Sequence, residues 1–241
     1  MYTVGDYLLD RLNELGITEI FGVPGDYNLD FLDTIIAHDQ LKWIGNANEL
    51  NAAYMADGYA RTRHAAAFVT TFGVGELSAI NGLAGSFAEN VPVVEIVGSP
   101  TSEVQNSEKL VHHTLGDGIF THFEQAHHSL TAAIAHLTAE NAAGEIDRVL
   151  SVLLETRRPV YINLPIDVAK AQIEKPSTPL SGQTNLTSPD EQLLETIQKA
   201  FLHAERPVVM TGHEIKSFGL EKKVQAFIEK KQTPCNHLKS W

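Results

Sequence analysis

Short apolar segments typical of buried strands alternate with segments typical of amphipathic helices along most of this chain. The strand-like segments lie at residues 19–23, 42–45, 65–70, 91–97 and 159–164. Helical stripes lie at residues 3–15, 29–36, from 49 onward, 76–89 and 146–153. Parallel strands joined by helices form a sheet with right-handed crossovers. We therefore predict an α/β fold with a doubly wound parallel sheet.

The ends of the first helix carry their own signals. Thr3 can act as the N-cap, because its hydroxyl can accept a hydrogen bond from the first turn. Gly16 follows the last apolar residue of the stripe, where glycine commonly ends a helix.

The composition changes at about residue 175, where Pro, Ser, Thr, Gly and Asn become frequent. We predict a first domain at residues 1–174, a linker at 175–187 and the start of a second domain at 188–241. Ser188 is the expected N-cap of a new helix, with Pro189 first in the helix and Glu191 completing a capping box. A strand at 207–210 and a helix at 220–230 follow. One strand is too little for an α/β layer, so we expect this second domain to be truncated.

Charge and cysteine content narrow the possible partners. The 241 residues include 18 Lys and Arg against 30 Asp and Glu, a net charge of −12 that disfavours nucleic acid. The single cysteine, Cys235, excludes an internal disulfide and a thiolate metal cluster. No signal peptide and no apolar run of about 18 residues are visible. We expect a soluble cytoplasmic protein that does not bind membranes.

Glu49 stands where the predicted strand at 42–45 gives way to a helix. A carboxylate in the first turn usually stabilises its helix through the dipole. Alternatively, an apolar pocket raises the pKa of the carboxyl group, which then shares a proton with a ring nitrogen of a ligand. The residue pattern alone leaves both interpretations open.

Three segments follow strands and are expected at one edge of the sheet: Pro24-Gly25-Asp26, Glu49 and Gly73-Val74-Gly75. Ligands of parallel sheets bind beyond the carboxyl ends of the strands. Each segment alone is weak evidence, because Pro-Gly-Asp is also an ordinary turn. Their coincidence predicts one shared site.

The chain contains two pairs of adjacent histidines. His112-His113 is either a pair of polar loop residues or a pair that transfers protons and holds an anionic substrate. No further ligands stand at zinc-binding spacing, so we predict no metal site in this chain. We expect His127-His128 to lie on the surface.

Several motifs together resemble the thiamine diphosphate-dependent 2-oxo acid decarboxylases, the group of pyruvate, indolepyruvate and branched-chain 2-oxo acid decarboxylases. The resemblance runs from Met1 to about residue 230, and the matching segments are residues 24–29, 45–51, 57–61, 70–75, 88–92 and 112–115. Family members are more than twice as long as this chain. The resemblance implies that residues 1–174 form the pyrimidine-binding domain, that a middle domain begins at about 188, and that the diphosphate-binding domain with its Mg²⁺ ligands is missing.

The resemblance also implies roles for individual residues. Glu49 matches the glutamate that hydrogen-bonds the aminopyrimidine of thiamine diphosphate and favours its imino tautomer. Asp26, His112 and His113 match polar residues around the substrate, and Thr71, Val23 and Pro24 match residues against the pyrimidine. The implied reaction is decarboxylation of a 2-oxo acid to an aldehyde through the cofactor ylide. A homodimer or tetramer is implied, and this chain alone is expected to be inactive.

Other functions remain as alternatives. An acetolactate synthase-like carboligase shares the glutamate but generally lacks the paired histidines. A non-catalytic truncated fragment agrees with the missing domain. A dinucleotide site at Gly73-Val74-Gly75 is disfavoured, because Ser78 stands where the third glycine belongs. Gly116-Asp117-Gly118 resembles the magnesium turn of thiamine diphosphate enzymes, but no Asn pair follows it, so we interpret it as an ordinary turn.

Overall fold

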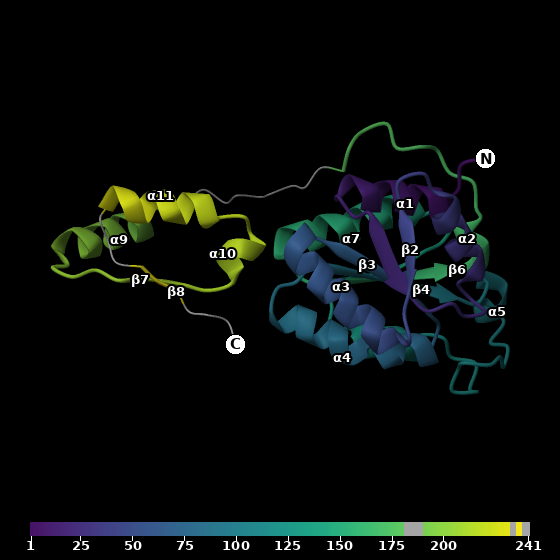
Figure 1. Cartoon of the computed structure of the whole chain (residues 1–241). Helices are drawn as coiled ribbons and strands as arrows, with labels where there is room; N and C mark the ends of the chain where they lie inside the picture. Colours follow the sequence, from purple (N-terminus) through teal and green to yellow (C-terminus); the bar gives the residue numbers. More distant parts are fainter. Residues whose placement is uncertain (181–189, 232–234, 238–241) are drawn as a thin grey trace. The chain divides into compact units, whose positions relative to one another are not determined.

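The structure is a computed structural model that describes residues 1–180, 190–231 and 235–237. The chain divides into two compact units, Met1–Gly182 and Gln183–Trp241, which are described separately (Figure 1).

The first unit is built on a six-stranded sheet in which all paired strands run parallel. The strand order is β2-β1-β3-β4-β6-β5. The strands are β1 (Glu19–Gly22), β2 (Lys42–Gly45), β3 (Ala66–Thr71), β4 (Val93–Ser99), β5 (Ala133–His136) and β6 (Val160–Pro165). The predicted α/β fold with a parallel sheet is confirmed.

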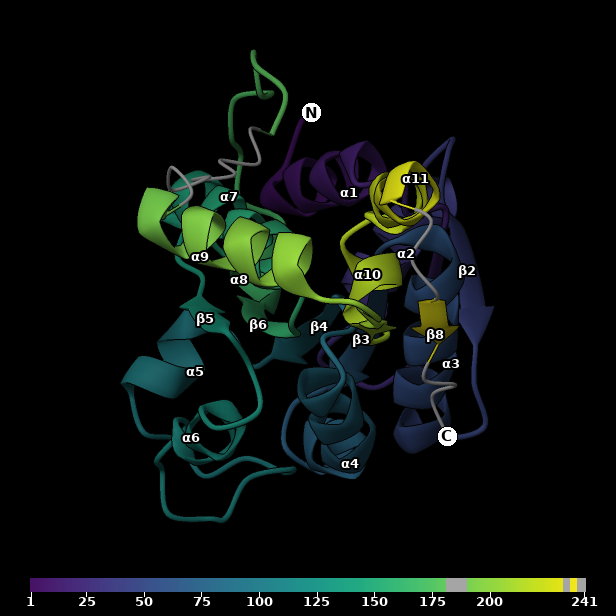
Figure 2. The same ribbon diagram turned by 90° about the vertical axis from the view of Figure 1, so that its left-hand side faces the viewer.

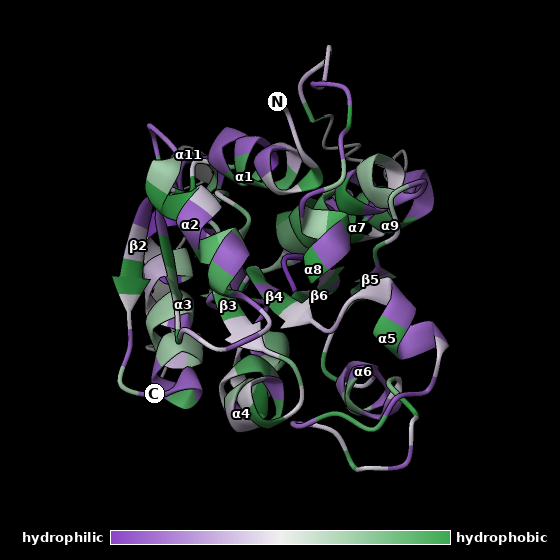
Figure 3. Cartoon of the chain, turned by 90° about the vertical axis from the view of Figure 1, so that its right-hand side faces the viewer, coloured by the Kyte–Doolittle hydropathy of each residue, from purple (hydrophilic) through white to green (hydrophobic). Residues whose placement is uncertain are grey.

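Helices cover both faces of this sheet (Figure 3). One face packs against α1 (Val4–Glu14), α2 (Leu29–Ala37), α7 (Ala142–Thr156) and α8 (Ile166–Ala169). The other packs against α3 (Glu49–Arg63), α4 (Val74–Ala88) and α6 (His122–His127). A short helix, α5 (Ser102–Asn106), follows β4. The two helical layers are also visible from the opposite side in Figure 2.

The central strands β3 and β4 are buried along their whole length. Successive side chains point to opposite faces, so Ala67 and Val69 join one core while Ala66 and Phe68 join the other. This two-sided burial explains why central parallel strands are nearly continuous apolar runs.

The predicted ends of the first helix are confirmed. Thr3 caps α1, since its hydroxyl accepts a hydrogen bond from the Asp6 amide at 3.2 Å. The Asp6 carboxylate in turn accepts one from the Thr3 amide at 2.8 Å. Gly16 follows the helix in the left-handed region, with φ of 79°.

Several predicted boundaries are shifted. The strand predicted at 91–97 begins at Val93, because Pro92 has no amide hydrogen to give to the ladder. The helix predicted from Glu76 begins at Val74. Strand β5 was not predicted, since Ala133–His136 is short and carries no strong strand signal.

The second unit contains α9 (Glu191–His203), β7 (Val209–Thr211), α10 (Glu214–Ser217), α11 (Glu221–Lys231) and β8 (Cys235–His237). Strands β7 and β8 pair in parallel. The predicted helix start was wrong: Asp190 is the N-cap, and its carboxylate accepts hydrogen bonds from the Gln192 and Leu193 amides. Ser188 and Pro189 lie outside the described residues.

Residues 175–180, at the start of the predicted linker, contact α1. Arg11 Nη1 donates a hydrogen bond to the Thr178 carbonyl at 2.8 Å, and the Leu180 amide donates to Glu14 Oε2 at 2.8 Å. Across the described parts of both units, no helix combines the length and apolar character needed to cross a bilayer.

Candidate functional site

The strand order places a topological switch point between β1 and β3. From β1 the chain moves outward to β2, then returns to the other side of β1 and continues through β3 and β4. Ligands of open α/β sheets bind beyond the carboxyl ends of the strands at such a point. Val23, Pro24 and Asp26 follow β1, Glu49 follows β2 and Thr71 ends β3, so these residues lie at this edge, and the His112–His113 loop follows β4.

The turn after β1 is fixed by a buried amide. Asn28, 1% exposed, donates a hydrogen bond from Nδ2 to the Val23 carbonyl at 3.1 Å. Its Oδ1 accepts one from the Gly25 amide at 2.9 Å. This holds Val23 and Pro24 beside the end of β3, while Asp26 points to solvent.

Thr71 lies directly beneath this turn. A Cβ added to Gly25 would sit 2.6 Å from the Thr71 Cβ, so only glycine fits there. Thr71 is 5% exposed. Within the described residues, neither its hydroxyl nor that of Thr70 has a hydrogen-bond partner. A buried hydroxyl without a partner is costly, and a polar ligand atom would satisfy it.

Glu49 is the first residue of α3, and its place is set by two asparagines. Asn48 caps the helix, with Oδ1 accepting from the Asn51 amide at 2.9 Å. Asn46 Oδ1 accepts from the Gly22 amide at 2.9 Å and so ties the end of β2 to β1. These bonds fix the first residue of α3, Glu49, beside the switch point between β1 and β3.

The Glu49 side chain is half-buried against the α4 start. A Cβ added to Gly75 would lie 3.4 Å from Glu49 Oε1 and 3.1 Å from Thr71 Cγ2. In the described part of the chain, no hydrogen bond or ion pair engages the Glu49 carboxylate. Its carboxylate therefore faces the same small space as Thr71.

The loop that carries His112 and His113 contacts this edge of the sheet at Gly73. Gly73 has φ of 70°, and a Cβ there would overlap the His113 carbonyl oxygen. His113 itself has φ of 61°, and its Nδ1 is buried without a hydrogen-bond partner among the described residues. The backbone of the turn Gly73-Val74-Gly75, called the glycine turn below, is therefore in contact with the backbone of His113.

His112 reaches across to the turn after β1. Its Nε2 lies 3.1 Å from Asp26 Oδ2. The His112 ring stacks on Tyr27 at 5.0 Å with an angle of 13° between planes, and Tyr27 Oη donates a hydrogen bond to the His112 carbonyl at 3.1 Å. The His112 and His113 rings meet edge to face at 4.6 Å.

The structure therefore brings together every residue that the sequence placed in the site: Asp26, Glu49, Thr71, Val23, Pro24, His112 and His113. Two carboxylates and two imidazoles surround an edge lined by backbone and by unpartnered hydroxyls. Such a set can hold a polar heterocycle and exchange protons with it or with a second ligand.

One prediction was wrong: His127 is buried, not on the surface, whereas His128 is exposed. His127 lies with Glu76, Glu95 and Tyr161 in a group whose side chains are 0% exposed. The sequence signal that could have indicated this cluster is Glu95, a carboxylate within the otherwise apolar 91–97 segment.

The buried cluster sits directly behind the glycine turn. Glu76 Oε1 accepts a hydrogen bond from the Gly73 amide at 2.7 Å, and Oε2 accepts one from Tyr161 Oη at 2.8 Å. Burial raises the pKa of Glu76 to about 7. For His127, burial alone would lower the pKa, but the adjacent Glu95 carboxylate outweighs it and raises the pKa to about 9.

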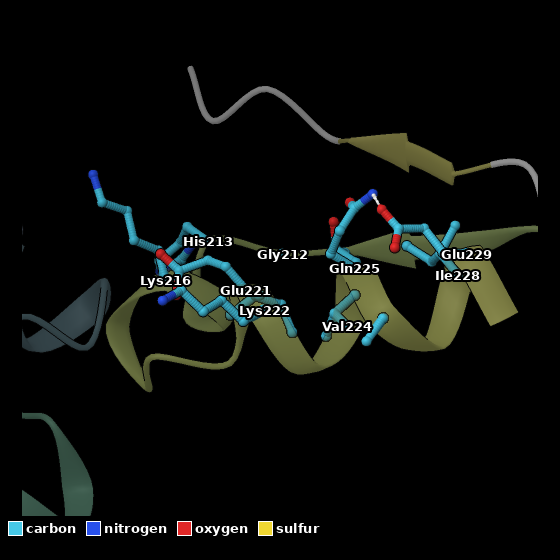
Figure 4. Close-up of a pocket in the computed structure, with 12 residues that line it drawn as sticks. Gly212, His213, Lys216, Glu221, Lys222, Val224, Gln225, Ile228 and Glu229 are labelled. Atoms are coloured by element: carbon cyan, nitrogen blue, oxygen red, sulfur yellow. Dashed lines mark hydrogen bonds between the residues drawn. The ribbon is translucent and has the colours of Figure 1, made fainter.

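Two other features of the chain do not contribute to this site. A cavity of about 570 Å³ in the second unit lies between the end of β7, α10 and α11 (Figure 4). None of the predicted site residues lines it. Among the described residues, no group of three or more His, Cys, Asp or Glu side chains is arranged to hold a metal ion. In the Gly116-Asp117-Gly118 turn, Gly116 and Asp117 are exposed and Gly118 is buried, and Asp117 pairs with His122 at 2.7 Å.

Comparisons with known proteins agree with this arrangement. Residues 2–128 match the family model described as thiamine pyrophosphate enzyme, N-terminal TPP binding domain. The chain is 59% identical over 189 residues to the alpha-keto-acid decarboxylase of Mycobacterium leprae, covering 78% of this chain and 33% of that protein. It is 56% identical over 209 residues to the one from Mycobacterium avium, covering 87% and 37%.

The fold has matches among solved structures. One is the thiamine diphosphate-dependent 4-hydroxybenzoylformate decarboxylase of Rhodococcus jostii RHA1, with a TM-score of 0.78, 20% identity, and coverage of 98% of this chain and 44% of that one. This chain spans about a third of the length of the curated relatives it matches. The resemblance seen in the sequence is confirmed at the level of the family: the chain belongs to the thiamine pyrophosphate enzymes, through their N-terminal TPP-binding domain.

Proposed function

We propose that the first unit binds the aminopyrimidine half of thiamine diphosphate within a 2-oxo acid decarboxylase that forms an aldehyde. The observation that carries this proposal is the half-buried Glu49 carboxylate, which lies against Gly75 and has no partner among the described residues. The names of the relatives support the reaction class.

The residues present fit the cofactor. Glu49 can form a hydrogen bond with a pyrimidine ring nitrogen, and the Thr71 hydroxyl, which is buried and unpartnered in the described chain, can bond a polar ring substituent. Val23 and Pro24 offer backbone and apolar contact beside them. Thiamine diphosphate supplies the electron sink for decarboxylation when bound. The role of the protein residues is to orient the ring and to hold a proton at Glu49.

Asp26, His112 and His113 are proposed to act on the substrate side. The Asp26–His112 pair is in contact with solvent, at 70% and 54% side-chain exposure, so a small anion can reach it. An imidazole can hold a carboxylate and donate or accept a proton near neutral pH. These properties suit placement of a 2-oxo acid and protonation of the product.

The site is open on the side of α3 and α4. Tyr54, Val74 and Leu77 on these helices are 51%, 57% and 41% exposed. Apolar side chains beside a polar site are typical of a surface that a further domain covers. We propose that a diphosphate-binding domain of a partner subunit, in a homodimer or tetramer, covers this face and supplies the Mg²⁺ ligands. The first unit then provides one half of the complete site. A cytoplasmic location also remains a prediction.

A chimera tests this function. Residues 1–182 of this chain replace the matching segment of the Mycobacterium leprae alpha-keto-acid decarboxylase, so that the remaining domains are supplied by a relative. The chimera is expected to release aldehyde and carbon dioxide from 2-oxo acids when thiamine diphosphate and Mg²⁺ are present. The parent decarboxylase serves as the positive control and the Glu49→Gln chimera as the negative control.

The result that would reject the proposal is a folded, oligomeric chimera with no decarboxylation. Formation of acetolactate in place of free aldehyde would instead favour the carboligase class. Circular dichroism and sedimentation of each protein establish folding and assembly before activity is compared.

A further inference from the structure

The mechanism proposed above leaves the buried Glu76–Glu95–His127–Tyr161 cluster unused. Four ionisable side chains that are 0% exposed are rare in a domain core, because each charge there loses its hydration. The cluster is surrounded by apolar rings, among them Phe72 and Phe123, whose centroids lie 5.1 Å apart. The cluster lies next to the glycine turn, and we argue that its charges serve to hold this turn in place.

Glu76 connects the cluster to the turn. Its two carboxylate oxygens accept hydrogen bonds from the Gly73 amide and from Tyr161 Oη. Both donors are satisfied best by the ionised carboxylate, since a protonated one would present its own hydrogen to a donor. The charge of Glu76 therefore matters for the geometry of the turn.

His127 and Glu95 stand behind Glu76. His127 Nδ1 donates a hydrogen bond to the Phe123 carbonyl at 2.7 Å and lies 3.8 Å from Glu76 Oε2. Its Nε2 lies 3.2 Å from Glu95 Oε2, in ion-pair contact without hydrogen-bond alignment. A protonated imidazole between two carboxylates favours the charged form of both.

The turn itself links both halves of the proposed site. Gly73 abuts the His113 carbonyl, and Gly75 abuts Glu49 Oε1. A displacement of the Gly73 amide therefore moves the contact surfaces of Glu49 and His113 together.

We propose that Glu76, held by Tyr161 and by the His127–Glu95 pair, is a positioning residue that sets the Gly73–Gly75 turn against Glu49 and His113. This inference deepens the proposed function, since it concerns the same site. The groups that face Glu76 are Glu95 from β4, Tyr161 from β6 and His127 from α6, with Glu124 of α6 farther out and paired to His136 of β5 at 3.1 Å.

Backbone amide NMR of the 15N-labelled 241-residue chain, without ligand, tests the proposal between pH 5.5 and 8.5. The amides of Gly73, Gly75 and His113 are expected to shift with one shared midpoint near 7, where the pKa of Glu76 lies. In Glu76→Gln this shared step disappears, and exchange of the Gly73 amide becomes about tenfold faster as a charge-assisted bond is lost. If Glu76 served only to cap α4, Glu76→Gln would lower the stability of the first unit, but the unaltered chain would show no shared pH-dependent step at these three amides.

Two further variants keep the test decisive if Glu76→Gln does not fold. Tyr161→Phe removes one donor to the carboxylate and is expected to raise the shared midpoint by about one pH unit. Glu145→Gln alters a carboxylate on α7, on the opposite face of the sheet, and should leave the step unchanged. Absence of a shared step in the unaltered chain, or its persistence in Glu76→Gln, overturns the inference.

The same samples separate this inference from the proposed function. Thiamine diphosphate added at millimolar concentration is expected to shift the Gly75 and Glu49 amides. A pH step without any ligand response would leave the positioning role in place and count against the cofactor site. A ligand response without the pH step would do the reverse.

Discussion

Glu49 and Gly75 come from different helices, yet only 3.4 Å separates Glu49 Oε1 from the position that a Cβ on Gly75 would take. This contact defines one wall of the proposed pyrimidine site. It also means that the site depends on the absence of a side chain at residue 75.

Gly75→Ala is expected to weaken binding of thiamine diphosphate about tenfold, because the added methyl group presses on both Glu49 and Thr71. Gly85→Ala in the same helix is the matched control, since a Cβ there meets nothing within 4 Å. It should leave binding unchanged and stabilise the chain by about 0.5–1 kcal/mol. For both variants of the chimera, titration calorimetry measures the affinity for thiamine diphosphate and scanning calorimetry measures the stability. Equal affinity in the two variants would argue that Gly75 does not border the cofactor.

Gly73→Ala is expected to destabilise the first unit by roughly 3 kcal/mol or more, from left-handed backbone strain and overlap with the His113 carbonyl. Gly116→Ala separates the two causes, because Gly116 has a similar φ of 74° but open space around it. That variant should cost only about 1–2 kcal/mol. Urea unfolding followed by amide exchange in β4 measures both, and equal losses would show that the His113 contact is unimportant.

Asp26→Asn should lower kcat/KM of the chimera at least about tenfold, because it removes the carboxylate that faces His112. Stability should change by less than about 0.5 kcal/mol, since the pair is exposed. Asp30→Asn breaks the exposed Asp30–Lys170 ion pair and is the control, expected to keep full activity. Steady-state kinetics distinguish them. Undiminished turnover in Asp26→Asn would exclude the proposed substrate-side role.

Stability should fall as the pH rises from 7 to 9. The folded pKa of His127, about 9, lies above its usual 6.5, so folding takes up a proton in this window and the stabilisation disappears as the pH rises through 9. The slope approaches 1.4 kcal/mol per pH unit. Glu76, with a raised pKa of about 7, contributes in the same direction mainly below this window.

His127→Gln should remove this slope and lower stability at pH 7, because two buried carboxylates lose their cation. His122→Gln, at a more exposed histidine paired with Asp117, should retain it. Exchange of the slowest β4 amides reports on the first unit alone. A slope that survives in His127→Gln would assign the titration to another group.

Much of the fold follows from the sequence because its strands are apolar runs bounded by turns. The strands at β1, β2, β3, β4 and β6 were predicted within about two residues, and the sheet edge that collects Asp26, Glu49 and Gly75 follows from strand polarity alone. Strand β5 was not predicted from the sequence, because the segment Ala-Ile-Ala-His is short and has no strong periodicity.

The buried cluster shows what local patterns miss. His127 stands beside another histidine in a six-residue helix, and nothing next to it in the chain indicates burial. Its partners Glu76, Glu95 and Tyr161 come from α4, β4 and β6, so only the tertiary fold brings them together. The start of α9 was misplaced for a local reason, since Asp190 competes with Ser188 as the cap.

The central claim is that Glu49 hydrogen-bonds the aminopyrimidine of thiamine diphosphate. Exchange of the cofactor C2 hydrogen for deuterium, measured by proton NMR after acid quench of the loaded chimera, tests it most directly. We predict that Glu49→Gln slows this exchange at least about 100-fold, within the usual range for loss of an acid–base group. Equal exchange rates in two proteins that bind the same amount of cofactor would contradict the account.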